Sequence, residues 1–326
     1  MKSTCFDRRA SAFIGGFILV FALGAQAQSY PSKSIRLVVA FPPGGFVDFA
    51  ARGISQRLAE NLNVPVVIEN RGGAGGTTGA DIVAKAAPDG YTLLATSISH
   101  TINLSVYKSL PYDTRRDFAP IMQIADAPNI LVVHPSLPVT SVQQLIALAR
   151  AKPGAITYAS SGVGTSTHLA GELFKSLTQT DLLHVPYKGG GPAVIDLVGG
   201  HVQAMFATLP SVLQHARSGK LRGLAVTGAR RFAGATEFPT IAESGVPGYE
   251  VSGWSGLFAP AGTPKEIIDR LVEQVSKILL APETKERFIA QGAEPSTRAT
   301  DAFARFVDSE IDKWKKVVEA SRIKAD

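Results

Sequence analysis

Runs of apolar residues with the length of a β-strand alternate along the chain with segments that repeat apolar residues at helical spacing. The first run covers 35–41 and stops at two prolines and two glycines, and residues 47–58 then show the helical repeat. The next predicted elements are a strand, a helix and a strand at 64–68, 80–87 and 91–96. Strands and helices in this order predict parallel strands joined by right-handed crossovers.

The same alternation starts again in the second third of the chain. Strands are predicted at 130–133, 156–159, 182–185, 202–206 and 221–226. Helices are predicted at 141–151, 166–177, 193–198, 211–218, 266–280 and 302–320. Two such series predict an α/β protein with two similar, doubly wound lobes, in which ligands bind beyond the carboxyl ends of the strands.

The first 27 residues have the pattern of a secretory signal peptide. A basic start with Arg8 and Arg9 is followed by an apolar stretch at 10–24 and by a small-residue motif that ends at Ala27. A transmembrane anchor is disfavoured, because the apolar stretch would rise about 22 Å as a helix and a bilayer core is about 30 Å thick. We therefore predict cleavage after Ala27 and export to the periplasm.

Composition removes several classes of function. With 45% hydrophobic and 18% charged residues in 326, the chain is an ordinary globular protein. Its one cysteine, Cys5, lies in the predicted signal peptide, which excludes a disulfide framework and a cysteine-ligated metal. The net charge of +6 falls to +4 after cleavage, and basic residues are spread along the chain, so we expect no nucleic-acid partner.

Known catalytic patterns are missing from the sequence as well. It contains no G-x-S-x-G nucleophile turn, no H-E-x-x-H and no phosphate-binding loop ending in Gly-Lys-Ser/Thr. The stretch 71–79 is rich in glycine, but its spacing is one residue longer than a dinucleotide fingerprint and it follows the second predicted strand. We predict a close-packing loop beside the ligand cleft there, and we expect no cofactor, no metal and no catalytic residue.

Two loops between a strand and a helix have the chemistry of an anion site. In the loop 41–48, two glycines permit close approach of the backbone, and the next helix directs its free N–H groups at the same point. Asp48 either caps this helix or orders the loop. The loop 159–168 brings five hydroxyl residues to another helix start, which is more than a cap needs. We expect His168 to be a neutral scaffold residue, because the helix dipole disfavours a charged imidazole.

Other strand ends provide further candidates. Tyr187 would line a pocket or cover the core, and Lys188 would contact an anion or remain a surface charge. The strand ends at 96–97 and 208–211 point toward the same cleft.

Eight short motifs occur in register over nearly the whole predicted mature chain. They are FPPGG at 41–45 with Asp48 three residues on, ENRGGAGGTTG at 69–79, PDGYTLL at 88–94, YASSGVGTSTHLAGELF at 158–174, HVPYKGGGP at 184–192, GKLRGLAVT at 219–227, PTIAE at 239–243 and WSGLFAPAGTP at 254–264. In these motifs the chain resembles the Bug family, the periplasmic solute receptors of tripartite tricarboxylate transporter systems.

The resemblance implies a type II periplasmic-binding-protein fold. Its first lobe would be discontinuous, with residues 28–124 and 229–326, and its second lobe would comprise 125–228. A hinge near 125–129 and 227–228 would close the lobes on a ligand. The family grips a carboxylate with turns that correspond to 43–45 and 160–166 here. Ala207 stands where many members have Asp, which favours a carboxylate without an amine.

The implied function is that of an extracytoplasmic solute-binding protein that delivers a small carboxylate to a membrane permease. We expect a monomer and no enzymatic activity. An exported α/β hydrolase, or a ligand sensor for a membrane signalling partner, is the alternative. The residues expected to form the ligand site are Phe41, Pro43, Gly44, Gly45, Asp48, Ala74, Thr96, Ser97, Ser160, Ser161, Gly162, Gly164, Thr165, Ser166, Tyr187, Lys188 and Ala207.

Overall fold

Strands and helices alternate through residues 30–321, the part of the chain that the computed structural model describes. The strands are β1 (Ile35–Val39), β2 (Val66–Asn70), β3 (Thr92–Ser97), β4 (Phe118–Val133), β5 (Thr157–Ser160), β6 (Leu183–Pro186), β7 (Ala204–Thr208), β8 (Arg222–Val226), β9 (Ser252–Pro260) and β10 (Glu294–Pro295). The helices are α1 (Phe46–Leu62), α2 (Thr77–Ala84), α3 (Ser99–Val106), α4 (Val142–Ala151), α5 (Ser166–Thr178), α6 (Gly190–Val198), α7 (Leu209–Arg217), α8 (Lys265–Leu280), α9 (Pro282–Ala290) and α10 (Thr300–Ser321). The predicted signal peptide and its cleavage site lie outside the described residues.

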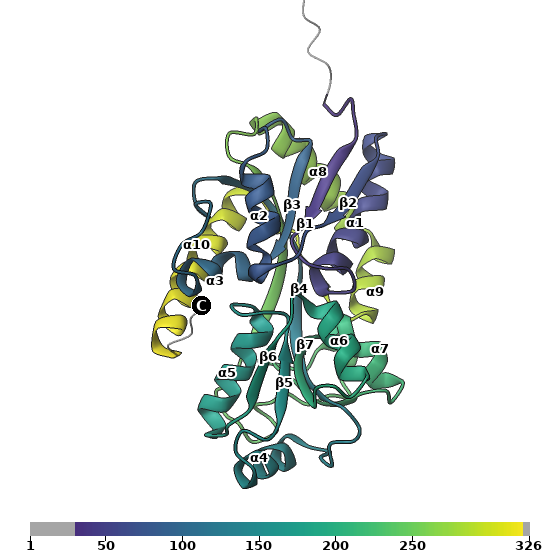
Figure 1. Ribbon diagram of the computed structural model, residues 1–326. Helices are drawn as coiled ribbons and strands as arrows, with labels where there is room; N and C mark the ends of the chain where they lie inside the picture. The colour runs from purple at the N-terminus through teal and green to yellow at the C-terminus, as the bar shows by residue number, and fades with distance from the viewer. Residues whose placement is uncertain (1–29, 322–326) are drawn as a thin grey trace, which may run out of the picture.

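The strands form one mixed sheet with parallel ends and an antiparallel middle (Figure 1). The order is β2-β1-β3-β9-β4-β7-β5-β6, and β8 and β10 also pair with β4. β1 is parallel to β2 and β3, and β5 is parallel to β6 and β7. The first group is the first predicted series, and the second group contains three of the five strands predicted in the second series. The other two, in β4 and β8, pair with each other in antiparallel orientation, so the expected parallel pairing is wrong for them. The predicted strands themselves are confirmed, with shifts at their ends.

Strand β4 belongs to both halves of the sheet. Its residues 118–128 pair with β9, and its residues 129–133 pair with β7. The N–H of Asn129 donates to Thr227 Oγ1 (2.9 Å), and the N–H of Thr227 donates to the Asn129 carbonyl (2.8 Å). The two connections predicted near 125–129 and 227–228 therefore lie side by side where the halves meet.

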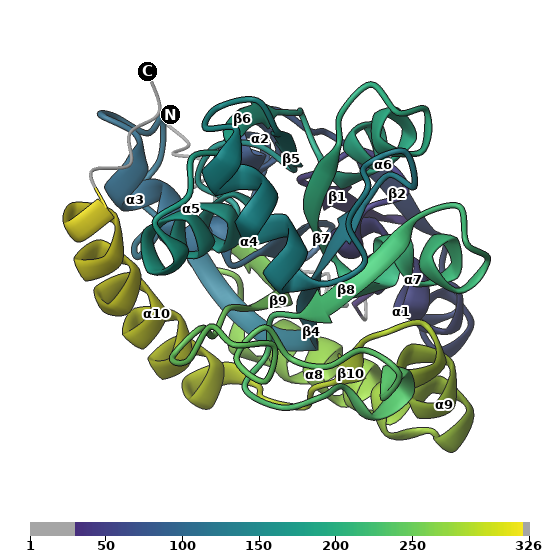
Figure 2. The same ribbon diagram turned by 90° about the horizontal axis from the view of Figure 1, so that it is seen from below.

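Helices cover both faces of the sheet (Figures 1 and 2). In the first half, α2, α3 and α10 lie on one side, and α1, α8 and α9 lie on the other. In the second half, α5 lies on one side, and α6 and α7 lie on the other. Because both faces are covered, β1 and β7 are buried along nearly their whole length, as their continuous apolar sequences predict.

Several elements of the described chain were not predicted: α3, α9, β9 and β10. Strand β9 contains two glycines, which weaken the sequence signal of a strand. A Cβ on Gly256 would lie 2.4 Å from the Phe303 ring, so the core requires the smallest residue there. No helix within residues 30–321 combines the length and apolar character that crossing a bilayer demands.

Candidate ligand-binding site

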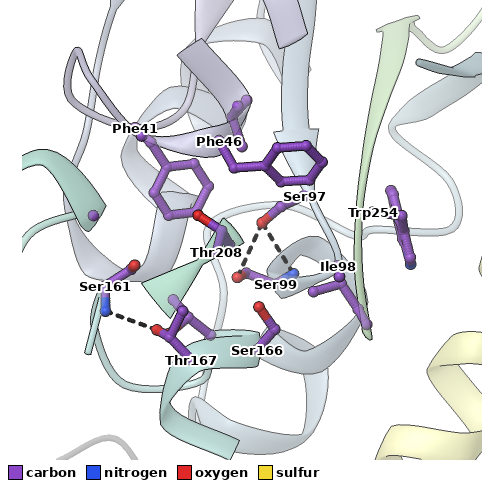
Figure 3. A pocket seen from close by; sticks show the side chains of 15 residues that line it. Phe41, Phe46, Ser97, Ile98, Ser99, Ser161, Ser166, Thr167, Thr208 and Trp254 are labelled. Carbon is purple, nitrogen blue, oxygen red and sulfur yellow. Dashed lines mark hydrogen bonds between the residues drawn. The ribbon is translucent and has the colours of Figure 1, made fainter. Parts of the chain in front are cut away.

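A cavity lies between the two halves of the sheet, where parallel strands of both series end (Figure 3). Its volume is about 30 Å³, which is space for about two water molecules. All fifteen residues of the described chain that line it are uncharged: Phe41, Gly45, Phe46, Val47, Ser97, Ile98, Ser99, Ser161, Thr165, Ser166, Thr167, Gly190, Thr208, Gly253 and Trp254.

The first predicted loop forms the wall that the first half contributes. Gly45 is the N-cap of α1, and no side chain satisfies the N–H groups of the first turn. Asp48 does not line the cavity; it is 4% exposed, and its carboxylate accepts from the Gly44 N–H (3.1 Å) and from Asn70 Nδ2 (2.9 Å). Arg52 Nε donates to the same carboxylate (3.0 Å). Of the two roles considered for Asp48, these contacts support the ordering of the loop.

The second predicted loop bonds largely to itself. Thr165 caps α5, because its Oγ1 accepts from the His168 N–H (3.4 Å), and it donates to the Gly162 carbonyl (2.7 Å). The Ser161 N–H donates to the Thr167 hydroxyl (2.8 Å). The hydroxyls of Ser161 and Ser166 have no hydrogen-bond partner in residues 30–321 and point into the cavity (Figure 3). These two hydroxyls are the side-chain donors that the loop leaves free.

Ser160 lies behind this loop and not at the cavity. Its side chain is fully buried, and its Oγ lies 2.6 Å from His184 Nε2. The ring of His168 stacks on that of His184 at 4.2 Å between centroids. Burial lowers the pKa of His168 to about 4 and that of His184 to about 3, so both imidazoles are neutral near pH 7. The predicted neutral state of His168 agrees with this environment.

Three further helices of the described chain begin at the cavity. Ile98 and Ser99 line it at the start of α3, Gly190 at the start of α6, and Thr208 just before α7. The hydroxyl of Ser97 donates to Ser99 Oγ (3.2 Å; Figure 3). With α1 and α5, five helix N-termini surround one uncharged space, and each presents N–H groups that favour negative charge.

Sequence reasoning missed the contribution of α3 because that helix was not predicted. It also gave no role to Trp254, although this residue lies in a motif. Trp254 closes the cavity from β9, and its Nε1 donates to Glu310 Oε2 (3.2 Å). The Glu310 residue is buried, with 6% of its surface exposed. In the described chain, no three His, Cys, Asp or Glu side chains gather as a metal site.

The structure brings together six of the predicted site residues as cavity lining: Phe41, Gly45, Ser97, Ser161, Thr165 and Ser166. Four other predicted site residues have a positive φ and so set the course of the backbone around the cavity: Gly44, Ala74, Gly162 and Gly164. Thr96 is buried in β3, and its carbonyl accepts from Ser255 Oγ (3.1 Å).

Besides Asp48 and Ser160, three further predicted residues lie away from the cavity. Tyr187 packs against the apolar cluster of the second half and donates to Asp196 (2.7 Å), and Lys188 is exposed. Ala207 is fully buried in the same cluster. Because side chains alternate along a strand, its neighbour Thr208 faces the cavity instead. None of these three residues lines the cavity.

The backbones of the two halves touch beside the cavity at two places. A Cβ on Gly191 would lie 2.2 Å from the Pro43 carbonyl oxygen, and one on Gly75 would lie 3.0 Å from the Val163 carbonyl oxygen. A Cβ on Gly79 would lie 2.8 Å from Ala40 Cα, so the stretch 71–79 packs closely as predicted, although residues 77–79 belong to α2 and not to a loop. Glycine at these contacts allows the halves to approach closely.

The fold and the cavity between the two halves are typical of an α/β solute-binding protein. The family model of the tripartite tricarboxylate transporter family receptor matches residues 50–323. The chain belongs to this family. Its members are periplasmic binding proteins, receptors rather than enzymes. The resemblance and the fold class predicted from the sequence are thereby confirmed.

Relatives cover almost the whole chain. It is 40% identical to protein BugT of Bordetella pertussis, over 97% of this chain and 98% of that protein. The solved structure of R. palustris Rpa4515 with adipate has 40% identity and a TM-score of 0.88, over 90% of this chain and 99% of that one. The structure of MatC from Rhodopseudomonas palustris with bound malate has 32% identity and a TM-score of 0.84, over 89% of this chain and 100% of that one.

Proposed function

We propose that this receptor binds a small carboxylate in the cavity and delivers it to the membrane permease of a tripartite tricarboxylate transporter. The observation that carries the proposal is the convergence of five helix N-termini of the described chain, with two free hydroxyls, on an uncharged space. Such N–H groups bind anions without a cationic side chain. The adipate and malate in two similar structures are both dicarboxylates.

The receptor works by hinge closure between two lobes, residues 28–124 with 229–326 and residues 125–228. The hinge lies where Asn129 bonds to Thr227. A cavity of about 30 Å³ is too small to admit a dicarboxylate, so the ligand binds an opened form and then touches both lobes. The mature chain begins after Ala27, resides in the periplasm and acts as a monomer.

The lining selects carboxylates that lack an amine. Phe41, Phe46 and Trp254 offer apolar surface to the ligand body, and no acidic side chain of the described residues lines the cavity. An ammonium group would therefore lose its water without gaining a charged partner. This argument replaces the one based on Ala207, which lies in the core.

A thermal-shift screen tests the proposal. Adipate and malate are compared with aspartate and with dimethyl adipate, which keeps the carbon chain but has no charge. A ligand at 100 times its Kd stabilises the native state by about 2.7 kcal/mol, which raises the Tm of a chain of this length by about 4 °C. A carboxylate that raises the Tm while dimethyl adipate and aspartate do not supports the proposal, and equal shifts for charged and uncharged compounds contradict it.

The contact between Ser160 and His184 does not favour the hydrolase alternative. A nucleophile must be reachable by substrate, whereas Ser160 is fully buried and its Oγ accepts from the Gly162 N–H (3.1 Å). Saturable carboxylate binding without hydrolysis of p-nitrophenyl acetate is the expected result. Hydrolysis that disappears in Ser160→Ala would overturn this assignment.

A further inference from the structure

Three aromatic rings stack beneath the second ligand loop. The ring of His184 lies between Tyr158 (4.9 Å between centroids, 23° between planes) and His168 (4.2 Å, 16°). Helix α5 confines the stack, because a Cβ on Gly171 would lie 2.3 Å from the Tyr158 ring. Rings packed this closely on both sides cannot shift without moving α5 or β5.

Each imidazole connects one ring nitrogen to the loop. His168 Nδ1 accepts from the Gly164 N–H (3.4 Å), so this nitrogen carries no proton. His184 Nε2 lies 2.6 Å from Ser160 Oγ, which itself accepts from the Gly162 N–H (3.1 Å). In the arrangement that we infer, the Ser160 hydroxyl donates its proton to an unprotonated His184 Nε2, the acceptor that lies within reach.

We propose that His168 and His184 are positioning residues of the ligand site, which act as two neutral acceptors that hold the loop 160–167 in its binding conformation. They touch no part of the cavity. Their effect passes through the glycine N–H groups to Ser161 and Ser166, whose hydroxyls are left free to meet the ligand. The consequence for binding rests on the proposed function.

The surroundings keep both rings neutral. On α5, Lys175 Nζ donates to Glu172 (3.0 Å), and the hydroxyl of Tyr158 on β5 donates to the same carboxylate (2.6 Å). Burial outweighs the negative charge of Glu172 and lowers the pKa of both imidazoles. Carboxylate affinity is therefore expected to show no histidine titration between pH 5 and pH 8. Protonation of His168 would place a donor against the Gly164 N–H and break this contact.

Paired variants separate hydrogen bonding from packing. His184→Phe keeps an aromatic ring but removes Nε2, whereas His184→Gln keeps a polar atom near the Nε2 position. Calorimetry with adipate is expected to show a Kd about tenfold higher for the Phe variant and within about threefold of wild type for the Gln variant. His168→Phe and His168→Asn form the corresponding pair for Nδ1. Equal Kd values within each pair would overturn the proposal.

A second measurement needs no ligand. Nitrogen-15 NMR of the wild-type imidazoles is expected to show unprotonated His184 Nε2 and His168 Nδ1 with no titration between pH 5 and pH 8. Amide hydrogen exchange at Gly162 and Gly164 is expected to be faster in the Phe variants than in the Gln and Asn variants. Wild-type protein that binds no carboxylate refutes the proposed function alone, whereas a titrating or protonated acceptor nitrogen refutes the positioning role, even if the variants fail to fold.

Discussion

Replacement of Gly191 by Ala is expected to hold the receptor open. A Cβ at this position would lie 2.2 Å from the carbonyl oxygen of Pro43, a backbone atom of the opposite lobe. Gly191 is not among the residues with positive φ and lies in the first turn of α6, so its φ permits Ala. Because Pro192 follows, the contact between the new Cβ and the proline ring offsets the preference of a helix for Ala over Gly, which is up to about 1 kcal/mol. The substitution therefore disfavours the closed form and leaves the fold of each lobe intact.

The size of the effect follows from the contact distance. Non-bonded carbon and oxygen atoms need more than 3 Å, so the lobes must separate by about 1 Å at Gly191 or distort by an equivalent amount. Forcing an extra methyl group into a packed site costs about 1–3 kcal/mol. Because only the closed form bears this cost, the apparent Kd rises by roughly 5- to 150-fold.

Calorimetry with adipate and small-angle scattering with and without adipate measure this effect. We expect weaker binding, less compaction at equal adipate concentration, and a free energy of unfolding within about 1 kcal/mol of wild type. The matched control is Gly199→Ala at the other end of α6, where φ is −74° and the nearest side chain is that of the exposed His201. If Gly191→Ala binds adipate as tightly as wild type, or if Gly199→Ala weakens binding equally, the closure argument is wrong.

Three further predictions concern single side chains. Ser161→Ala is expected to raise the carboxylate Kd without changing the free energy of unfolding, because the Ser161 hydroxyl faces only the cavity. Thr165→Ala is expected to lower the free energy of unfolding by about 1 kcal/mol, because the N-cap of α5 is lost. Calorimetry and urea titration of both variants measure these effects, and an exchange of the two effects would contradict the assignment. Of the two tryptophans in the chain, Trp254 alone lines the cavity, so Trp254→Phe abolishes the ligand-induced fluorescence change and Trp314→Phe preserves it; the reverse pattern would place the ligand elsewhere. Burial raises the pKa of Asp126 to about 6, so the stability that its protonated carboxyl confers is present below about pH 4 and is lost as the pH rises through 6. In urea denaturation at pH 8, Asp126→Asn should have a higher free energy of unfolding than wild type, and this difference should shrink toward pH 4. A difference that does not depend on pH would refute the raised pKa.

Hydrophobic periodicity predicted most of the fold because most elements have a clear inner face. Helix α3 is the exception: residues such as His100 and Asn103 are buried as fully as Ile102, so no amphipathic stripe marks the helix. In β4, Pro120 and Pro128 interrupt the apolar run, and only its end was predicted as a strand. The full strand forms because β9 pairs with it despite irregular register.

The candidate site was predicted at the level of loops, and individual donors were not. The sequence shows which groups are able to donate, but it does not show which of them bond to one another. In the loop 160–167 the N–H groups of Ser161 and Gly162 donate to side chains of the loop itself, and that of Gly164 donates to His168. Ser99 and Trp254 reach the cavity through long-range pairing of β3 with β9, which no local pattern encodes.

The uncharged lining also determines what ligand release leaves behind. A receptor that holds an anion with a buried arginine is left with an uncompensated cation when the anion departs, at a cost of several kcal/mol. Here departure exposes hydroxyls and N–H groups that water molecules can satisfy. In the proposed function, emptying the site therefore requires no compensating charge from the membrane partner, which needs only to separate the lobes for the anion to leave.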